Sequence, residues 1–401
     1  MQREDIVRAA IGLMALLLPY IGAYTVIPLA AIFSLDPGTR LLSASLGLLL
    51  IMRPALSLVN TNLPLYIIAI SFVASAIAPM AFRKFETLAG SLIYLLITVI
   101  IGFPLASLIS AGGLSSERIL FMAILGGLSG AFLHHASRER DFTVPFGTAM
   151  VMWLFSFDYP LPDLHRILLI CIFALVLGIG AYWAKAADSD AVLSETTVCL
   201  LVILFGGLTW FMLLLAFYLL GGGFTRYGYA RKAKLGIAQS HGGMRGYKNV
   251  YSNSLVPLIL AICYGVYRNE IFIYAFIASV ATANGDTLAS EIGETSGSKP
   301  RMITTLKETE PGVDGGVTPL GEAASIAGAL IIGILATVTG MTGPFGIVAG
   351  AIGGFLGTNF DSFLGATLQR RGLLSNNGVN LAATSFGALV GAVLWYILQI
   401  I

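Results

Sequence analysis

Charged side chains are scarce in this chain. Asp, Glu, Lys and Arg make up 11% of its 401 residues, whereas soluble domains carry about 25%. Apolar residues make up 57% and the mean hydropathy is +0.86. These values exclude an ordinary water-soluble domain and indicate a protein that crosses a lipid bilayer several times. The 23 basic residues form no run with interleaved aromatics, so the sequence gives no indication of a nucleic-acid partner.

Several familiar site patterns are also missing. The three cysteines, Cys171, Cys199 and Cys263, are scattered in apolar stretches with no CxxC spacing, and the four histidines have no HExxH-like spacing. A zinc site is therefore not expected. No GxxxxGK[ST] run occurs, which excludes a Walker A loop. The N-terminus has mixed charge and no clear cleavage site, so we expect a first spanning helix there and not a cleaved signal.

The long apolar runs predict an all-α fold, a polytopic bundle of about eleven transmembrane helices. Several N-terminal candidates are short or contain proline, such as Pro19 and Pro28 in the first. The candidate segments are 6–33, 41–52, 63–82, 87–111, 119–133, 143–157, 166–184, 197–220, 250–267, 270–289, 320–340, 343–360 and 378–401.

The charges between these segments predict a topology for the C-terminal half. The loop 224–249 carries six Lys or Arg residues and no acid, and the positive-inside rule places such a loop in the cytoplasm. Two helical hairpins follow, and each returns a carboxylate, Asp286 and then Asp361, to that same face. By the same counting, the acidic loop 185–195 should lie outside. All of these polar groups follow residue 165, so we expect an accessory bundle over 1–165 and a catalytic transmembrane domain over 166–401.

Residues 284–322 hold seven of the 21 acidic residues of the chain and three of its 23 basic ones. Within this run Asp286, Ser290 and Gly293 recur at helical spacing and share one face. Polar groups at this density are costly beside a bilayer and indicate a functional site. Since Mg²⁺ is commonly held by one or two carboxylates plus phosphate oxygens, we predict a metal site at Asp286 with Asp361 as a second ligand.

A glycine-rich turn follows in the same run and precedes a helix that begins near Leu320. Glycine-rich turns and helix N-termini both present backbone N–H groups to phosphate. The predicted phosphate contacts therefore come from this turn, from the preceding helix and from three nearby cations: Gly312, Gly315, Gly316, Thr318, Ser290, Gly293, Lys299, Arg301 and Lys307.

The basic loop supports two interpretations. It forms an anion-binding site, or it carries only the excess of Lys and Arg that the positive-inside rule predicts for a cytoplasmic loop. Its candidate anion ligands, with two asparagines at the start of the next helix, are Arg226, Arg231, Lys232, Arg245, Asn249 and Asn253.

An ordered set of runs in the C-terminal half resembles one family. The runs are FTRYGYARKAKLG, GGMRGYKNV, NGDTLASEIG, PGVDGGVTPLG, DSFLGATLQ and NNGVN. Together they are similar to the family called domain of unknown function 92, which includes transmembrane protein 19 of animals and a plastid phytyl-phosphate kinase, over roughly residues 175–401. The segment from Gly285 to Gly293 is also distantly similar to phytol and dolichol kinases, which use CTP.

The resemblance implies a membrane-embedded kinase that transfers a phosphoryl group from CTP or ATP to an isoprenyl monophosphate. Mg²⁺ would then be held by Asp286 and Asp361, with Lys299, Arg301 and Lys307 acting on the nucleotide. The phosphate of the acceptor lipid would be held by four of the loop's basic residues and by the two asparagines: Arg226, Arg231, Lys232, Arg245, Asn249 and Asn253. The active face would be the cytoplasmic face of the cell membrane.

Two alternatives remain open from the sequence. One is a CTP-dependent prenol kinase, whose free alcohol acceptor would require a base near the metal, or a cytidylyltransferase that forms a CDP-lipid. The other is a membrane transporter of a small anion or lipid, which would commonly show inverted repeats and polar groups at the bilayer midplane.

Overall fold

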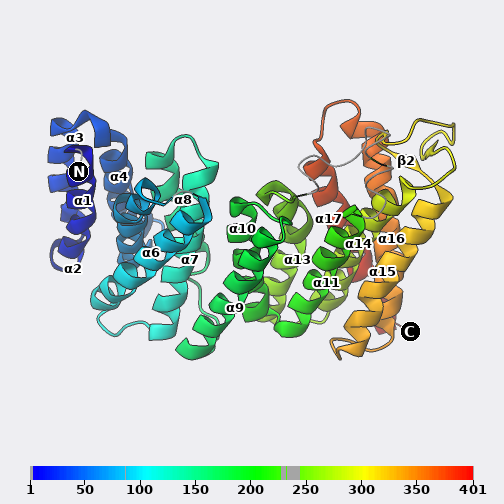
Figure 1. Cartoon of the computed structure of the whole chain (residues 1–401). Helices are drawn as coiled ribbons and strands as arrows, with labels where there is room; N and C mark the ends of the chain where they lie inside the picture. The colour runs from blue at the N-terminus through cyan, green and yellow to red at the C-terminus, as the bar shows by residue number, and fades with distance from the viewer. Residues whose placement is uncertain (1–2, 86, 227–231, 233–243, 401) are drawn as a thin grey trace. The chain divides into compact units, whose positions relative to one another are not determined.

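The computed structural model describes residues 3–85, 87–226, 232 and 244–400. Helices account for nearly all of the regular structure (Figure 1), which confirms the predicted all-α fold. Twelve helical segments of the described chain are long and apolar enough to span a membrane, close to the expected eleven. The protein is therefore a polytopic membrane protein.

The chain forms two compact units, Met1–Leu175 and Val176–Ile401. They divide inside helix α9 (Leu164–Trp183), after the predicted boundary at residue 165. The separation into an accessory and a catalytic part is a functional one and stays a prediction.

The first unit begins with a broken helix. Its elements are α1 (Arg3–Leu13), η1 (Met14–Leu17), α2 (Leu18–Ile21), η2 (Gly22–Thr25), α3 (Val26–Leu35), η3 (Pro37–Thr39), α4 (Arg40–Ser57), α5 (Leu65–Phe72), η4 (Val73–Ile77), η5 (Ala78–Arg83), α6 (Thr87–Ser110), α7 (Ser116–Ala136), α8 (Arg140–Leu154) and most of α9. The predicted segment 6–33 is interrupted at Gly22, whose φ of +52° suits glycine. The predicted short segment 41–52 is a full span, because α4 continues through Pro54 to Ser57.

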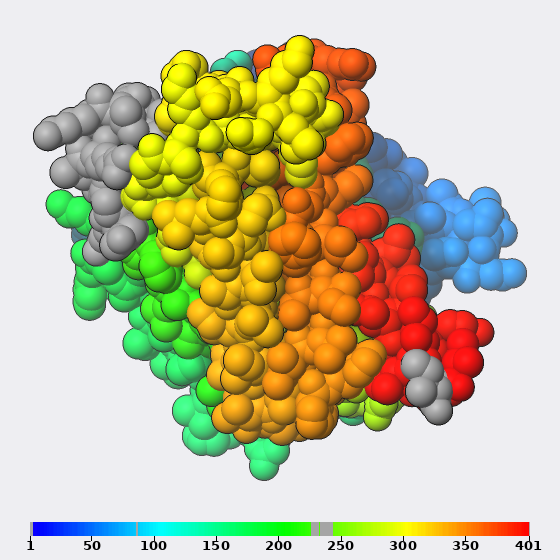
Figure 2. Space-filling view, turned by 90° about the vertical axis from the view of Figure 1, so that its right-hand side faces the viewer, coloured from blue at the N-terminus to red at the C-terminus, as the bar shows by residue number. Residues whose placement is uncertain are grey.

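The second unit contains a helical bundle and one small hairpin. Its elements after α9 are α10 (Ser189–Phe205), α11 (Leu208–Arg226), α13 (Tyr247–Tyr267), α14 (Ile271–Gly293), β1 (Arg301–Met302), β2 (Gly316–Val317), α15 (Pro319–Val338), α16 (Phe345–Leu364), η7 (Gly365–Gln369) and α17 (Asn376–Ile400). The antiparallel strands pair Arg301 with Val317 and Met302 with Gly316. Figure 2 shows the segment with this hairpin, in yellow, over one end of the orange helices.

One sequence prediction is wrong here. The expected segment 197–220 is two helices, α10 and α11, separated at Gly206-Gly207, where Gly207 has a φ of +100°. The expected loop 185–195 is largely the first turns of α10, whose N-terminus is capped by the Asp188 carboxylate accepting from Ala191 N–H. Polar residues at a helix start thus resembled a loop.

The missed break also corrects the topology. The Ala187 backbone pairs with that of Arg245, because Arg245 N–H donates to Ala186 O at 2.8 Å and Asp188 N–H donates to Arg245 O at 3.1 Å. Residues 185–188 therefore lie beside the end of the basic loop, on the same face. Residues 185–195 were predicted on the opposite face because one helix was expected between them and the basic loop, where the structure has two, α10 and α11.

Helix α14 is the centre of this unit. Of the residues in the most apolar stretch of α14, 78% are buried, against 28% for α17. Helix α14 packs on α15, α16 and α17. Glycines allow these contacts: a Cβ at Gly328 would lie 3.2 Å from the Asn284 carbonyl oxygen, and one at Gly391 would overlap that of Tyr274. This close packing fixes the end of α14, where the polar residues begin.

Candidate functional site

A cavity of about 330 Å³ lies at one end of the second unit. It is bounded by the last turns of α11, α14 and α16, the first turns of α13, α15 and α17, and the turn before β2. Segments far apart in the sequence thus converge on one polar space at helix ends, and not near the middle of the helices.

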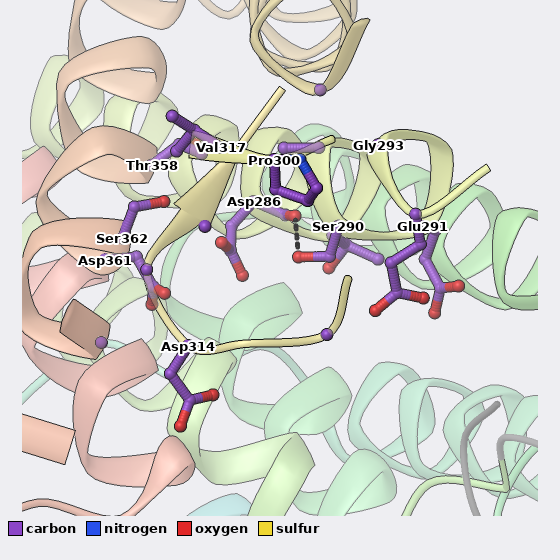
Figure 3. A pocket seen from close by; sticks show the side chains of 18 of the residues that line it. Asp286, Ser290, Glu291, Gly293, Pro300, Asp314, Val317, Thr358, Asp361 and Ser362 are labelled. Carbon is purple, nitrogen blue, oxygen red and sulfur yellow. Dashed lines mark hydrogen bonds between the residues drawn. The ribbon is translucent and has the colours of Figure 1, made fainter. Parts of the chain in front are cut away.

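Three aspartates form a carboxylate wall of this cavity, which we define as Asp286, Asp314 and Asp361 (Figure 3). Asp361 lies close enough to the other two for their charges to interact. Oδ2 of Asp361 is buried and has no hydrogen-bond partner among the described residues. Like charges without donors are unfavourable next to one another, so this wall is suited to a cation.

Local backbone structure holds the carboxylate wall in place. Asp286 lies two turns before the end of α14, and its carbonyl accepts a hydrogen bond of 3.0 Å from the Ser290 hydroxyl. Asp314 is in the glycine-rich turn, where Gly315 has a φ of +80° and packs so closely on Ala366 that a Cβ would overlap it. The glycine therefore lets the turn dock on η7 and brings Asp314 to the cavity.

The start of α15 forms the adjoining wall. The Thr318 hydroxyl caps this helix by accepting from Gly321 N–H at 3.0 Å. A Cβ at Gly293 would lie 3.2 Å from the Thr318 hydroxyl oxygen and 3.3 Å from Gly321 Cα. The absence of side chains at both glycines brings the end of α14 against the start of α15 and leaves backbone exposed to the cavity.

Arg245 forms the arginine wall. Its guanidinium carbon lies 5.0 Å from the ring centre of Phe217 and 5.6 Å from that of Tyr218. The Nη2 atom occupies space that a Cβ at Gly221 would fill, while Nη1 is buried and has no hydrogen-bond partner in the described part of the chain. A rigid, desolvated guanidinium with unused donors is suited to a phosphate or carboxylate.

A buried ion pair borders the cavity between these walls. Glu291 and Lys232 form this pair, with side chains only 4% and 2% exposed, and the Thr225 hydroxyl donates to the other Glu291 oxygen at 2.9 Å. Lys232 is therefore committed to Glu291 and does not itself line the cavity among the described residues. Its predicted role as a direct phosphate ligand therefore stays a prediction, and in this structure its charge is paired with Glu291.

Glu294 adds an ionisable group to the lining. Burial and, to a lesser extent, the negative charge of Glu291 raise its pKa to about 7, against the opposing positive charge of Lys232. The cavity charge thus changes near neutral pH.

The structure brings most of the predicted ligands together and separates the others. The predicted residues that line the cavity are Asp286, Ser290, Gly293, Gly312, Gly315, Gly316, Thr318, Asp361, Arg245, Asn249 and Asn253. Lys299, Arg301 and Lys307 do not line it; all three are exposed, and the first two border a separate depression. Arg231 and the side chain of Arg226 lie outside the described residues.

The hairpin explains why the three cations are displaced. Consecutive residues of a strand face opposite sides, and here Met302 is buried while Arg301 is exposed. Lys299 lies 3.8 Å from Glu308 in a solvent-exposed ion pair. These cations therefore lie outside the cavity that the glycine-rich turn lines, and their predicted action on a nucleotide stays a prediction.

Sequence reasoning missed Asp314 and Glu294 as lining residues. Asp314 had a visible signal, because a carboxylate between glycines in the PGVDGG run sits where the backbone can approach a ligand. Glu294 had none, since it ends a helix in a run of other polar residues.

The lining is strongly acidic. Among the described residues it has one guanidinium, that of Arg245, and six carboxylates: Asp286, Glu291, Glu294, Asp314, Glu322 and Asp361. No three His, Cys, Asp or Glu side chains in the described chain form a complete metal site. A cation held here would therefore need ligands from a bound molecule as well, as Mg²⁺ in nucleotide sites does.

These features define a polytopic membrane protein with a polar cavity at the helix ends of its second unit. Residues 172–388 match the family described as "Integral membrane protein DUF92", and the chain belongs to this family. The match begins near the end of the first unit, which lies almost entirely outside it.

Relatives occur in archaea and plants. An uncharacterized membrane protein of Methanocaldococcus jannaschii is 34% identical over 230 residues, 57% of this chain and 92% of the relative. Protein PGR of Arabidopsis thaliana is 28% identical over 52% of this chain and 81% of the relative. The chloroplastic protein VTE6 of the same plant is 26% identical over 49% of this chain and 64% of the relative. No solved structure matches this chain.

Proposed function

We propose that the second unit is a membrane-embedded isoprenyl-phosphate kinase, which transfers the terminal phosphoryl group of CTP or ATP to a prenyl monophosphate. The carrying observation is that the carboxylate wall and the arginine wall face one cavity, which combines a place for a cation with a place for an anion. The sequence resemblance supports the isoprenoid class of acceptor.

The carboxylate wall favours a donor that enters with a divalent cation. A bare nucleoside triphosphate would be repelled by six carboxylates. Asp286 and Asp361 would hold Mg²⁺, which would supply positive charge against the phosphates of the nucleotide. The unpartnered Oδ2 of Asp361 fits a metal ligand in its donor chemistry.

The arginine wall favours an acceptor that already carries a phosphate. Arg245 would bind and orient that phosphate through its unused N–H groups, with Asn249 and Asn253 beside it on α13. A phosphate oxygen of the acceptor then attacks the terminal phosphorus of the nucleotide, and the bond to the β-phosphate oxygen breaks. Because a phosphate oxygen is already nucleophilic, this reaction needs no general base. A free prenol would need one, and it would also leave the buried Nη1 of Arg245 without an anion, which favours the phosphate acceptor.

The place of the polar groups also bears on the transport alternative. The cavity lies at helix ends, where water-soluble nucleotides arrive, whereas transporter sites are commonly near the midplane. This arrangement supports a surface reaction on a lipid substrate, and we place it at the cytoplasmic face of the cell membrane because the basic loop adjoins it.

The test is phosphoryl transfer by the purified full chain in liposomes. Geranylgeranyl monophosphate would be offered with Mg²⁺ and either γ-labelled CTP or γ-labelled ATP. We expect labelled diphosphate, lost in Asp286→Asn and retained in Glu310→Gln, an exposed acid outside the lining. Transfer to geranylgeraniol alone would select the prenol-kinase alternative, and no transfer to either acceptor by correctly folded protein would refute a kinase.

A second variant tests the acceptor side separately. Arg245→Gln should raise the KM for prenyl monophosphate by about tenfold or more, with a much smaller effect on the KM for the nucleotide. Equal effects on both substrates would contradict the assignment of this wall to the acceptor.

A further inference from the structure

The first unit contains a cavity of its own, of about 290 Å³. It is bounded by α1, by the irregular turns η4 and η5, by the end of α7 and by the start of α8. Its charge is the reverse of that in the second unit, because three guanidiniums and one carboxylate line it: Arg8, Arg83, Arg140 and Asp141.

Two of these arginines are held in position by acids and keep free donors. Arg8 donates from Nη1 and Nη2 to Asp141 at 2.8 and 2.7 Å, and from Nε to Glu4 at 3.0 Å. A guanidinium has five N–H groups, so two of Arg8 remain. Arg83 is paired with Asp5, whose side chain is 7% exposed, while that of Arg83 is 43% exposed. Both cations are thus preorganised while still able to bind an anion.

Arg140 is the uncommitted cation. It is exposed at the rim, lines the cavity and makes no hydrogen bond or ion pair with any described residue. It is also the first residue of the 15-residue helix α8, whose N-cap residue Glu139 provides no side-chain cap. The first N–H groups of α8 and the helix dipole therefore favour an anion at the same place.

The same cavity also has apolar lining residues. Pro79, Met80, Phe82 and Val144 line it beside the arginines, and the His134 ring stacks on Phe82 with centres 4.6 Å apart. A ligand that fits has an anionic group at the arginines and an apolar part against these residues. Inorganic phosphate alone would leave the apolar residues uncovered.

The cavity also lies at the level where lipid headgroups are found. The candidate span Leu65–Arg83 ends at it, the span Ser116–Ala136 ends just after His134, and the first span begins a few residues before Arg8. Ends of spanning helices mark the boundary between hydrocarbon and headgroups.

We propose that this cavity is a binding site for the phosphate of an amphiphile, an anionic lipid headgroup, held by Arg140, Arg83 and the start of α8. The site is separate from the cavity of the second unit and does not depend on a kinase activity there. The phosphate accepts from the free N–H groups, and the first part of the apolar chain lies against Pro79, Met80 and Phe82.

The test is binding of dihexanoyl phosphatidate to the purified full chain in a neutral detergent, measured by calorimetry. Arg140→Gln should weaken binding by about tenfold, the effect of one lost charge-assisted contact. Arg138→Gln is the matched control, because it removes the same charge two residues away, at a side chain that does not line the cavity. Binding to Arg138→Gln should stay within about twofold of the unsubstituted protein.

Further probes identify the ligand class. Dihexanoylglycerol, which lacks the phosphate, should not bind, and inorganic phosphate should compete only weakly. Equal binding of dihexanoylglycerol would overturn the proposal in favour of a purely apolar pocket, and equal losses in both arginine variants would overturn it in favour of general charge attraction. If inorganic phosphate binds as tightly as phosphatidate, the ligand of this cavity is a soluble anion and not a lipid. Asp286→Asn should bind phosphatidate normally, so failure of the proposed kinase function would not affect this result.

Discussion

The two walls of the second-unit cavity differ in how their charges are supported. The arginine wall is a single side chain fixed by two aromatic rings, by a glycine and by backbone pairing with residues 186–188. The carboxylate wall is three side chains, of which Asp314 is exposed to solvent while Oδ2 of Asp361 is buried without a hydrogen-bond donor among the described residues. The protein alone thus fixes the position of the guanidinium, although each wall keeps one buried atom without a partner among the described residues, Nη1 of Arg245 and Oδ2 of Asp361.

This difference indicates which partner each wall receives. A preorganised guanidinium binds an anion directly and loses little on binding. Unsupported carboxylates destabilise the folded chain until a cation arrives, a common arrangement in sites where stability is exchanged for function. The following variants test the comparison, beginning with the largest expected effect.

Neutralising the carboxylate wall should separate stability from activity. Asp361→Asn removes a buried, repelled charge, so the Tm of the protein in EDTA should rise by about 2–4 °C. Phosphoryl transfer should fall by about a hundredfold or more, since a charge that stabilises the transferred group is lost. A thermal melt and a transfer assay on the same preparation measure both.

The matched control is Glu310→Gln, which removes an exposed acid outside the cavity and should change neither quantity. A drop in Tm of Asp361→Asn would show that this carboxylate has a stabilising partner, and the contrast between the walls would then be wrong.

Displacing Arg245 without removing it should reduce activity less than the loss of Asp361 does. In Gly221→Ala the new methyl group overlaps Nη2 of Arg245, and the rings of Phe217 and Tyr218 limit where the guanidinium can go. We expect the KM for the prenyl monophosphate to rise by about three- to tenfold, because the guanidinium shifts without being lost.

Gly222→Ala is the control for that variant. It makes the same change in the same helix, and a Cβ there would meet no heavy atom within 4 Å among the described residues beyond its own stretch of helix. Any effect on helix propensity is shared. Equal kinetics in the two variants would mean that the position of Arg245 does not matter.

Glu294 should make stability depend on pH. Its pKa of about 7 in the folded protein lies above the ordinary value of 4.5, so the folded state keeps a proton that the unfolded state has released. The contribution of Glu294 to stability should therefore decrease as pH rises from about 4.5 to about 7. Melts across that range should show a shallower decline in Glu294→Gln, and an unchanged slope would contradict the assignment.

The smallest effect is expected at the displaced cations. Because Lys299, Arg301 and Lys307 are exposed and outside the lining, replacing all three with Gln should change kcat/KM for the nucleotide by less than about threefold. A loss as large as that in Asp361→Asn would restore the sequence-based prediction and imply that the hairpin closes over a bound nucleotide.

The helices of the C-terminal half could be predicted because they are single apolar runs bounded by charge. The predicted segments 250–267 and 343–360 differ from α13 and α16 by only a few residues at their ends. The α10–α11 break could not be predicted by hydropathy, because Gly206-Gly207 does not interrupt the apolar run. That one missed turn reversed the predicted side of residues 185–195.

The lining residues that lie at helix ends could be predicted to come together. Asp286, Asp361 and Asn253 converge because antiparallel helices return to one face. The direction of Arg301 was not predictable, because it depends on the register of a two-residue strand. The pairing of Lys232 with Glu291 depends on tertiary contact across 59 residues, which no local pattern shows.

The close packing of α14 also restricts where an acceptor's hydrocarbon chain can run. On the sides of α15, α16 and α17, backbone meets backbone or small side chains, as at Gly328 and Gly391, and no methylene chain fits between such helices. A tail anchored at Arg245 would therefore leave past α11 and α13, into the bilayer. The phosphate would stay at the helix ends. Most of the prenyl chain would contact lipid and not protein, so the protein should accept prenyl monophosphates of different chain lengths.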